Sequence, residues 1–472
     1  MALLRSLWRE RWLILGLSLG LIVASLHPPE GMGPEGMKAL GLLALAVVLF
    51  ITEPIPLPAV ALLIAFLQVL LGLGSPTEVA RSFMSDAILF IIGSLMISVA
   101  IVKQRFDRRI ALFLFRLTGP RTGRFVFGLV AVAAILSSLI GAYTMAALLL
   151  PMALAIISQA QKEGAEMRTA NLERLLLLAI AYGCTIGTCG TPSGGPRNAI
   201  ILEYWERLFG LEMSYPGWIA HLYPLVLLQI PLVGGLLLWT FRPEVRDLSP
   251  VLAHLRASLR GNAWGRRDWG VLGVFLLTLC GWLTLSGRLG LGAVALAGAA
   301  LYLISGLVSW EELNSGVNWG VVLLYAAIIS LGYQMKETGA AAWLADHLLR
   351  GLRPLGLAQG LPLLLGMGLL TVLFANSMSS GAAVAVLGPL TLNLAALSGG
   401  SLLSAGLLTA GASTFAYLTV IAAPATLIVY GGSEGQLSSR DLLRAGFRLL
   451  PASVIILIGV AALYWPRLGP GR

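Results

Sequence analysis

The stretch GTCGTPSGGPRNAII, residues 187–201, interrupts a chain that otherwise consists of long apolar segments. It contains four glycines, two prolines, an asparagine and Arg197, between runs of leucine, isoleucine and valine. Such residues break a helix, and irregular backbone at membrane depth is tolerated only where protein or a water-filled cavity surrounds it. The stretch therefore predicts a membrane helix that is broken near its middle, beside a polar site.

The composition of the whole chain agrees with a membrane location. Hydrophobic residues make up 57% and charged residues 11%, against about 25% charged in soluble domains. The mean hydropathy is +0.87. The net charge of +10 comes from basic residues in short loops, which orient membrane proteins and do not indicate nucleic-acid binding. Three cysteines, all in apolar segments, predict neither a disulfide framework nor a metal site.

We predict an all-α polytopic membrane protein with about eleven spans and two re-entrant helical hairpins. The apolar segments of spanning length lie near 12–27, 38–52, 57–73, 86–102, 176–205, 217–241, 269–286, 289–308, 318–335, 401–430 and 446–465. Two further stretches, 122–158 and 355–398, carry the patches GAYT and ANSMSSG at their middles. We predict that these two form the hairpins, with tips that stop partway through the bilayer.

Charge predicts the orientation in the cytoplasmic (inner) membrane. Lysine and arginine cluster in 103–124 and in 242–267, whereas the loops 28–37 and 74–85 hold one arginine between them. The positive-inside rule then places the N-terminus in the cytoplasm, and eleven spans leave the C-terminus outside.

The chain contains an internal repeat. Residues 75–104 and 309–337 both begin with serine and an acidic residue, run through a span and end at a lysine. In each half an amphipathic stretch, a hairpin and a broken span follow, and the second break lies in STFAYLTVIAAPATLIVYGG, 413–432. The two copies enter the membrane from opposite sides, which is typical of secondary transporters with a solute site between the breaks. The alternative is that glycine and proline merely kink packed spans.

Several motifs resemble the divalent anion:sodium symporter family of the ion transporter superfamily, whose members carry dicarboxylates, citrate or sulfate. They include ITEPIPLPAVALL (51–63) and RDLLRAGFRLLPASVIILIGVAALYW (440–465), and the resemblance covers nearly the whole chain after the first span. It implies a homodimer with an elevator mechanism. In this chain we assign 1–119 and 246–354 to the scaffold part and 120–245 and 355–472 to the mobile transport part.

The chain departs from the family at its two hairpin tips and two breaks. The family's Thr-Pro-Pro-Asn becomes Gly-Pro-Arg-Asn at 195–198 and Ala-Pro-Ala-Thr at 423–426. The family's Ser-Asn-Thr tip becomes Gly-Ala-Tyr at 141–143 and Ala-Asn-Ser at 375–377. An alternative alignment of the second tip, anchored on the following proline, selects 379–381.

The resemblance also implies two sodium sites. The second is retained through Thr371, Asn376 and the carbonyls of Ala422 and Pro424. The first keeps Ser137 and Gly194 but has alanine where the family has asparagine. We therefore expect sodium at the second site, and we expect no organic cofactor.

Arg197 is the central candidate for binding the solute. An ionised side chain at the bilayer centre costs about 2.5–3.5 kcal/mol, so it needs a partner or water. Our hypothesis is that its planar fork binds a carboxylate or oxyanion, or that its charge replaces the first sodium. The alternative is a structural arginine paired with glutamate or with carbonyls. Further candidates are Tyr143, Thr144, Pro196, Asn198, Asn376, Ser377, Ser379, Ser380, Pro424, Ala425 and Thr426.

The predicted function is secondary transport of a small divalent organic anion by sodium symport. Sodium-independent exchange and transport of an inorganic anion such as sulfate remain as alternatives. We do not expect an enzyme, because no metal or nucleophile constellation lies in a span. An ATP-driven pump is not expected either, because the ATP-binding motif GxxxxGK[ST] is absent. The expected partners are the anion, the lipid bilayer and a second copy of the chain.

Overall fold

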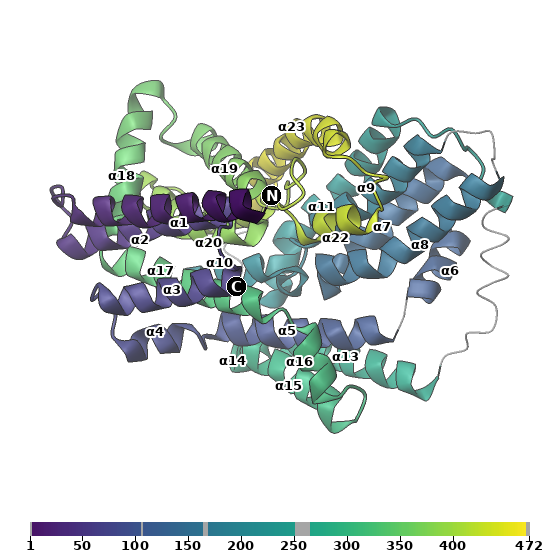
Figure 1. The fold of residues 1–472 in the computed structure, drawn as a ribbon, viewed down its shortest axis with the longest axis horizontal. Coiled ribbons are helices and arrows are strands. Elements are labelled where there is room, and N and C mark those ends of the chain that lie inside the picture. The colour runs from purple at the N-terminus through teal and green to yellow at the C-terminus, as the bar shows by residue number, and fades with distance from the viewer. Residues whose placement is uncertain (1, 105–106, 164–168, 251–264, 469–472) are drawn as a thin grey trace.

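The computed structural model describes residues 2–104, 107–163, 169–250 and 265–468 (Figure 1). These residues form helices joined by loops, with one isolated bridge between Arg121 and Asp247. Ten of the described helices are long and apolar enough to cross a membrane. The prediction of an all-α polytopic membrane protein is confirmed.

The two halves of the chain repeat one order of elements. The first half contains α1 (Ala2–Ser25), α2 (Pro34–Thr52), α3 (Leu57–Leu70), α4 (Pro76–Ser82), α5 (Asp86–Lys103), α6 (Asp107–Thr118), α7 (Thr122–Ile140), α8 (Ala142–Glu163), α9 (Ala170–Gly187), η1 (Pro192–Gly194), α10 (Pro196–Phe209) and α11 (Tyr215–Thr240). The second contains α13 (Arg266–Thr284), α14 (Ser286–Leu289), α15 (Leu291–Ile304), α16 (Trp310–Gly316), α17 (Trp319–Glu337), α18 (Ala340–Leu352), η2 (Arg353–Leu355), α19 (Gly360–Ser377), α20 (Ser380–Ser398), α21 (Leu402–Ala412), α22 (Pro424–Gly432), α23 (Ser439–Leu463) and α24 (Trp465–Leu468).

The serine and acidic residue that open each repeat are helix caps. Ser75 and Glu78 form a capping box at α4, and Ser309 and Glu312 form one at α16. In each box the serine hydroxyl and the glutamate carboxylate accept backbone N–H groups that have no partner within the helix. The sequence similarity between 75–104 and 309–337 therefore reflects the same short helix placed before each of α5 and α17.

Both predicted hairpins are present as helix pairs. The first hairpin, α7 and α8, turns at Gly141, whose φ of 84° favours glycine. The second hairpin, α19 and α20, turns at Met378 and Ser379. Its turn thus follows the first alignment considered above, 375–377, and overlaps the second, 379–381, at Ser379. That the tips stop partway through the bilayer stays a prediction.

Both predicted helix interruptions are also present. The first break, 188–195, separates α9 from α10, and the second break, 413–423, separates α21 from α22. Each following helix begins with proline, which suits the first helical position because its missing N–H would have no partner there. Neither broken span continues as one helix.

The helices after the breaks pack across the two halves. α10 packs against α20 and α21 of the second half, whereas α22 packs against α8 and α9 of the first. Figure 1 shows α22 beside α8 and α9. Each hairpin therefore contacts a helix that follows the other half's break.

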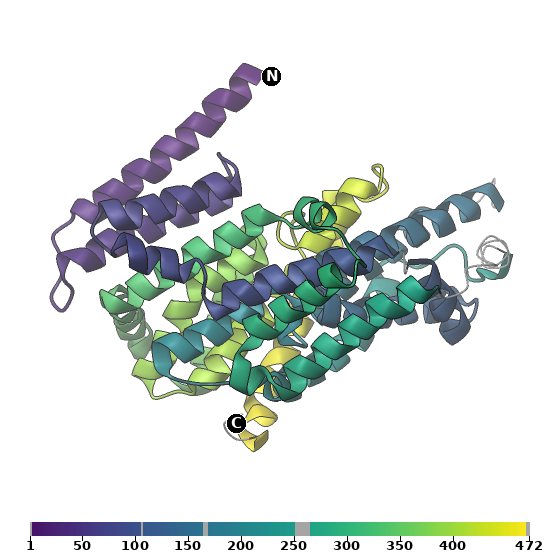
Figure 2. The same cartoon turned by 90° about the horizontal axis from the view of Figure 1, so that it is seen from below.

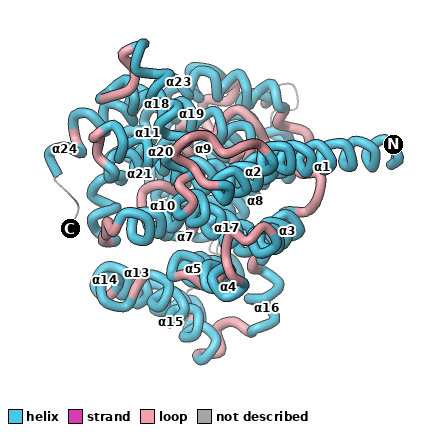
Figure 3. The backbone as a smooth tube through the Cα atoms, turned by 90° about the vertical axis from the view of Figure 1, so that its left-hand side faces the viewer, coloured by secondary structure: helices cyan, strands magenta, loops and turns pink. Residues whose placement is uncertain are grey.

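The helices that we assign to the scaffold lie around these helices. α4, α5 and α13–α16 form a layer on one side of the molecule (Figure 3), and α5 packs closely on α15 where Gly93 meets Ala295. α1 packs on α2, and its N-terminal end projects away from the other helices (Figure 2). Within this layer, α5 contacts α10, the helix that follows the first break.

We predict that replacing Gly187 with alanine destabilises the protein by about 1–3 kcal/mol, because α7 and α9 leave no room for a methyl group. A Cβ at Gly187 would overlap the carbonyl oxygen of Ala134, which is backbone and cannot rotate away. Thermal unfolding of the purified protein in detergent measures the effect. Gly273→Ala is the control, because nothing lies within 4 Å of a Cβ there. Equal unfolding temperatures for both variants would contradict the prediction.

Candidate functional site

The tip of the first hairpin is bonded to the first break. The Ser137 hydroxyl donates to the carbonyl of Cys184 at 2.8 Å, and the Thr191 hydroxyl donates to the carbonyl of Ser138. Gly194 lies so close to the carbonyls of Ser138 and Thr188 that a side chain would not fit. The two first-site sodium candidates, Ser137 and Gly194, are thus both at this contact.

Asn198 holds the first break in its irregular path. Its Nδ2 donates to the carbonyls of Thr188 and Thr191, both at 2.7 Å. The side chain is fully buried, and its Oδ1 has no hydrogen-bond partner in the described part of the chain. A buried acceptor without a partner costs free energy, so Oδ1 is available to a water molecule or a ligand.

Arg197 connects the first break to the second hairpin. Its side chain is 5% exposed, and its guanidinium donates to the hydroxyls of Ser380, at 2.8 Å, and Thr188. Nε has no acceptor, and among the described residues no carboxylate forms an ion pair with it. The charge is therefore held by two neutral hydroxyls and is not compensated by a neighbouring anion.

The tip of the second hairpin is bonded to the second break through Asn376. Its Nδ2 donates to the carbonyl of Phe415 at 2.9 Å, and its Oδ1 accepts from the backbone N–H of Leu418 at 2.8 Å. The backbone carbonyl of Asn376 also accepts from the Thr419 hydroxyl at 2.8 Å. Asn376 thus fixes the second break in the way that Asn198 fixes the first.

The other second-site sodium candidates lie near the same contact. The Ala422 carbonyl accepts from the backbone N–H of Ser380 at 2.9 Å, which joins the tip to the end of the break. Thr371 is fully buried one turn before Asn376, and its hydroxyl donates to the carbonyl of Met367 at 2.8 Å. Hydroxyl, amide and carbonyl oxygens are a donor set that suits a hard cation such as sodium. The donor chemistry of these residues therefore fits the predicted ion.

The first turns of α10 and α22 resemble each other chemically. Thr426 is the third residue of α22, as Asn198 is the third of α10. Its hydroxyl is fully buried and, within the described ranges, has no hydrogen-bond partner. Ala425 is buried beside it, while Pro196 and Pro424 begin the two helices. The N-terminal ends of helices attract anions through their free N–H groups and the helix dipole.

Some predicted residues lie outside this buried group. The Tyr143 side chain is 62% exposed, and the Ser377 hydroxyl donates to the carbonyl of Leu373 on an exposed face of α19. The Ser379 hydroxyl caps α20 by accepting from the backbone N–H of Ala382. Thr144 is buried, but no bond among the described residues joins it to either break. Hydrogen bonds therefore join Arg197, Asn198, Asn376 and Ser380 to the breaks and the second tip, whereas Tyr143 and Ser377 make no bond to either break within the described residues.

Sequence reasoning missed two residues of this group. Thr188 accepts from Arg197 through its hydroxyl and from Asn198 through its carbonyl. Tyr325 of α17 is buried against Gly381 at the second tip, where a side chain on the glycine would overlap the tyrosine hydroxyl. Thr188 lies within the stretch 187–201, so its hydroxyl could have been predicted to belong to the polar site. Nothing in the sequence marks Tyr325.

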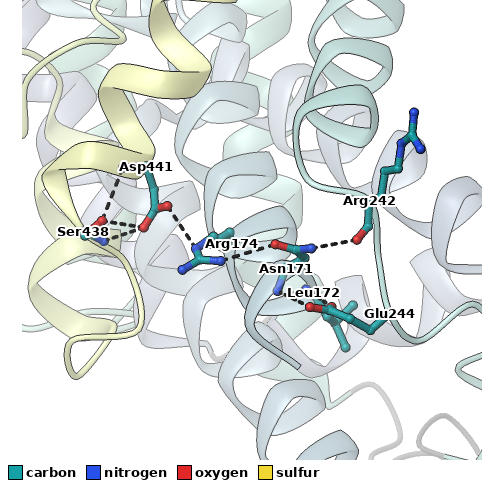
Figure 4. Close-up of polar contacts among 7 residues, drawn as sticks. All are labelled: Asn171, Leu172, Arg174, Arg242, Glu244, Ser438 and Asp441. Carbon is teal, nitrogen blue, oxygen red and sulfur yellow. Dashed lines mark hydrogen bonds and ion pairs between the residues drawn. The ribbon is translucent and has the colours of Figure 1, made fainter. Parts of the chain in front are cut away.

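A second polar network lies at the opposite end of α9 (Figure 4). The Glu244 carboxylate accepts from the backbone N–H groups of Asn171, at 3.0 Å, and Leu172, at 3.2 Å. Arg174 pairs with Asp441 at 3.0 Å, and Asp441 in turn caps α23. This network joins α9, the residues that follow α11, and α23 into one unit.

Two helices broken at matching points, each bonded to a hairpin tip, define a membrane transporter of the inverted-repeat class. The residues 6–470 match the family described as "Sodium:sulfate symporter transmembrane region". The chain therefore belongs to this family, which confirms the resemblance to divalent anion:sodium symporters.

Known proteins of similar sequence are transporters. An uncharacterized transporter of Haemophilus influenzae is 27% identical over 489 residues, which cover 98% of this chain and 99% of that protein. The sodium-dependent dicarboxylate transporter SdcS of Staphylococcus saprophyticus is 25% identical over 483 residues, covering 96% of this chain and 91% of SdcS.

Two solved transporter structures share the fold. The YdaH transporter of Alcanivorax borkumensis matches with a TM-score of 0.57 at 15% identity, covering 99% of both chains. MtrF of Neisseria gonorrhoeae, described as illuminating a class of antimetabolite efflux pumps, matches with a TM-score of 0.57 at 12% identity, covering 98% of this chain and 94% of MtrF. At these identities the similarity concerns the fold alone.

Proposed function

We propose that this transporter moves small divalent organic anions, of the dicarboxylate or citrate type, across the cytoplasmic membrane. The observation that carries the proposal is Arg197, a buried cation held by two hydroxyls with no carboxylate paired to it among the described residues. A dicarboxylate supplies the missing negative charge. The name of SdcS, a sodium-dependent dicarboxylate transporter, supports the same substrate class.

Several unpartnered atoms are available to such an anion. Nε of Arg197 and the Thr426 hydroxyl can donate hydrogen bonds, and the backbone N–H groups that begin α10 and α22 add positive potential. Two carboxylate groups on one substrate suit two helix N-termini, one from each half. The Oδ1 of Asn198 accepts instead, so it suits a substrate hydroxyl or a water molecule.

We propose sodium coupling through Thr371, Asn376, Ala422 and Pro424. Sodium bound there supplies positive charge beside the second break and favours the binding of the anion. In the first half, Ala142 offers no side-chain oxygen, while Arg197 brings a fixed positive charge to the first break. This difference favours a second candidate function, sodium-independent anion exchange with Arg197 in the role of one sodium ion.

The transport movement that we propose is an elevator within a homodimer. The hydrogen bond from Arg197 to Ser380, and the ion pair in Figure 4 between Arg174 of α9 and Asp441 of α23, join 120–245 to 355–472 as one moving part. The parts 1–119 and 246–354 form the stationary scaffold. The N-terminus is in the cytoplasm and the C-terminus outside.

Uptake of labelled succinate into proteoliposomes tests the proposal. Three conditions are compared: an inward sodium gradient, potassium only, and unlabelled succinate inside, with citrate and sulfate as competitors. Uptake that requires sodium supports symport, whereas uptake that requires only internal succinate supports exchange. No succinate uptake under any of the three conditions, together with uptake of labelled sulfate, would overturn the organic-anion assignment.

A further inference from the structure

Glu203 is a buried acid at the boundary between the two proposed parts of the transporter. It lies on α10, two turns beyond Arg197, and is 4% exposed. One carboxylate oxygen accepts from the hydroxyl of Tyr333 on α17, and the other accepts from the backbone N–H of Ala87 at 3.2 Å. Both donors belong to the proposed scaffold, whereas α10 belongs to the proposed transport part.

The bond to Ala87 caps the N-terminus of α5. Ser85 occupies the capping position of α5, but its side chain makes no capping hydrogen bond. The Glu203 carboxylate accepts one of the first N–H groups of α5 in its place, and a negative charge there is also favoured by the helix dipole. A helix of the scaffold is thus capped by a residue of the moving part.

The remaining partner of Glu203 is weaker and moves with it. Arg207 lies one turn further along α10, its Nε is 3.4 Å from the Glu203 carboxylate, and more than half of its side chain is exposed. Exposed ion pairs of this kind contribute little. When α10 leaves α5 and α17, the carboxylate therefore loses its two buried donors and keeps only the exposed one.

Asp86, another acid that lines the same cavity, does not bridge the boundary in this way. A cavity of about 660 Å³ is lined by Asp86, Glu203, Glu206 and Glu212, among others. The Asp86 carboxylate caps α15 by accepting from Leu291 and Gly292, both at 3.0 Å, so its bonds stay within the scaffold. The cavity lets water reach Glu203, which supplies replacement hydrogen bonds once the scaffold donors are lost.

We propose that Glu203 is a positioning residue that fastens the transport part to the scaffold in the conformation seen here. Its bonds to Ala87 and Tyr333 break each time the transport part moves, so they set the population of this conformation. The inference rests on the proposed elevator movement. It does not depend on which anion is carried or on the coupling ion.

The test measures the distance between the two parts in the full-length protein in lipid nanodiscs. Spin labels are placed at Ile304→Cys on α15 and Leu397→Cys on α20, both exposed positions. The background carries Cys280→Ser, because the other two cysteines are buried. Distance distributions are recorded without ligand, with sodium, and with sodium and succinate.

We expect Glu203→Gln to lower the ratio of the present conformation to the alternative one by about tenfold, because a hydrogen bond to a charged group is replaced by a weaker neutral one. Tyr333→Phe is expected to act in the same direction, and the double variant to shift the ratio by less than the product of the two single effects. Succinate affinity per binding-competent molecule is expected to stay unchanged. Glu206→Gln is the matched control, since Glu206 is exposed on the same helix and lines the same cavity.

The outcomes distinguish the role of Glu203 from the elevator movement itself. Two distance populations in the unmodified chain, with the same ratio in Glu203→Gln and Tyr333→Phe, overturn the role of Glu203 and leave the elevator intact. A single distance under all three conditions overturns both. If Glu203→Gln fails to fold, Tyr333→Phe decides the question, because it removes one hydroxyl and leaves the carboxylate.

Discussion

Replacing Arg197 with glutamine is expected to lower succinate uptake about 100-fold or more at substrate concentrations below saturation. Each hydrogen bond to a charged group contributes about 1.5–3 kcal/mol, and the guanidinium supplies the only buried positive side chain that the described residues place at the breaks. Arg197→Lys keeps the charge but loses the planar fork, so we expect an intermediate loss. Initial uptake rates in proteoliposomes over a range of succinate concentrations measure both effects.

Two further variants separate a role in binding from a role in folding. Arg350→Gln is the control, because Arg350 is exposed on α18 and pairs only with Asp346 one turn away. Arg197→Pro restores the family residue at the second position of α10, where proline is tolerated. If Arg197 replaces a sodium ion, this variant changes the cation dependence of uptake. If Arg197→Pro leaves both the substrate affinity and the cation dependence of uptake unchanged, Arg197 neither binds the substrate nor replaces the charge of a sodium ion.

The second large effect is expected for Asn376→Ala, which should remove sodium-dependent uptake, with a loss of about 100-fold. The variant deletes a proposed sodium ligand and leaves the carbonyl of Phe415 and the N–H of Leu418 without their partners. An unsatisfied buried group costs about 1–3 kcal/mol, so the second break also loses its fixed path. Uptake is measured against sodium concentration, and thermal unfolding is measured with and without sodium.

The sodium response distinguishes ion binding from general destabilisation. We expect sodium to raise the unfolding temperature of the unmodified chain, since a ligand that binds only the folded state stabilises it. Asn376→Ala should lose this response. Asn393→Ala is the matched control on the same hairpin, because its amide donates only to the Pro389 carbonyl of its own helix. If sodium stabilises Asn376→Ala as much as the unmodified chain, Asn376 is not a ligand.

The order of helices could be predicted from the sequence because each signal is local. Runs of apolar residues indicate spans, and glycine and proline at 187–196 and at 424 indicate where two of them break. The second tip was harder to place, because Asn376 and Ser379 both suit a helix end. In the structure Asn376 belongs to the last turn of α19, while Ser379 caps α20.

The contacts of the site could not be predicted from local patterns. Ser380 meets Arg197 only because α10 packs on the second hairpin, and the two residues lie far apart in the sequence. Glu203 appears in the sequence as one acid within a short helix, and no neighbouring residue marks Tyr333 as its partner. Tyr143, predicted from its position at a tip, has an exposed side chain in the structure, and its role in the site stays a prediction.

The crossed packing of α10 and α22 has a consequence for biosynthesis. During translation the first half leaves the ribosome with Arg197 in α10 before Ser380 exists to accept its hydrogen bond. Until then the Thr188 hydroxyl is the one partner from the first half that the described residues give Arg197, and a poorly compensated arginine is costly in lipid, so α10 is expected to remain near water or the insertion machinery until the second hairpin has been made. The first half lacks part of its membrane packing on its own, and a chain truncated before α19 is therefore expected to be degraded by quality-control proteases.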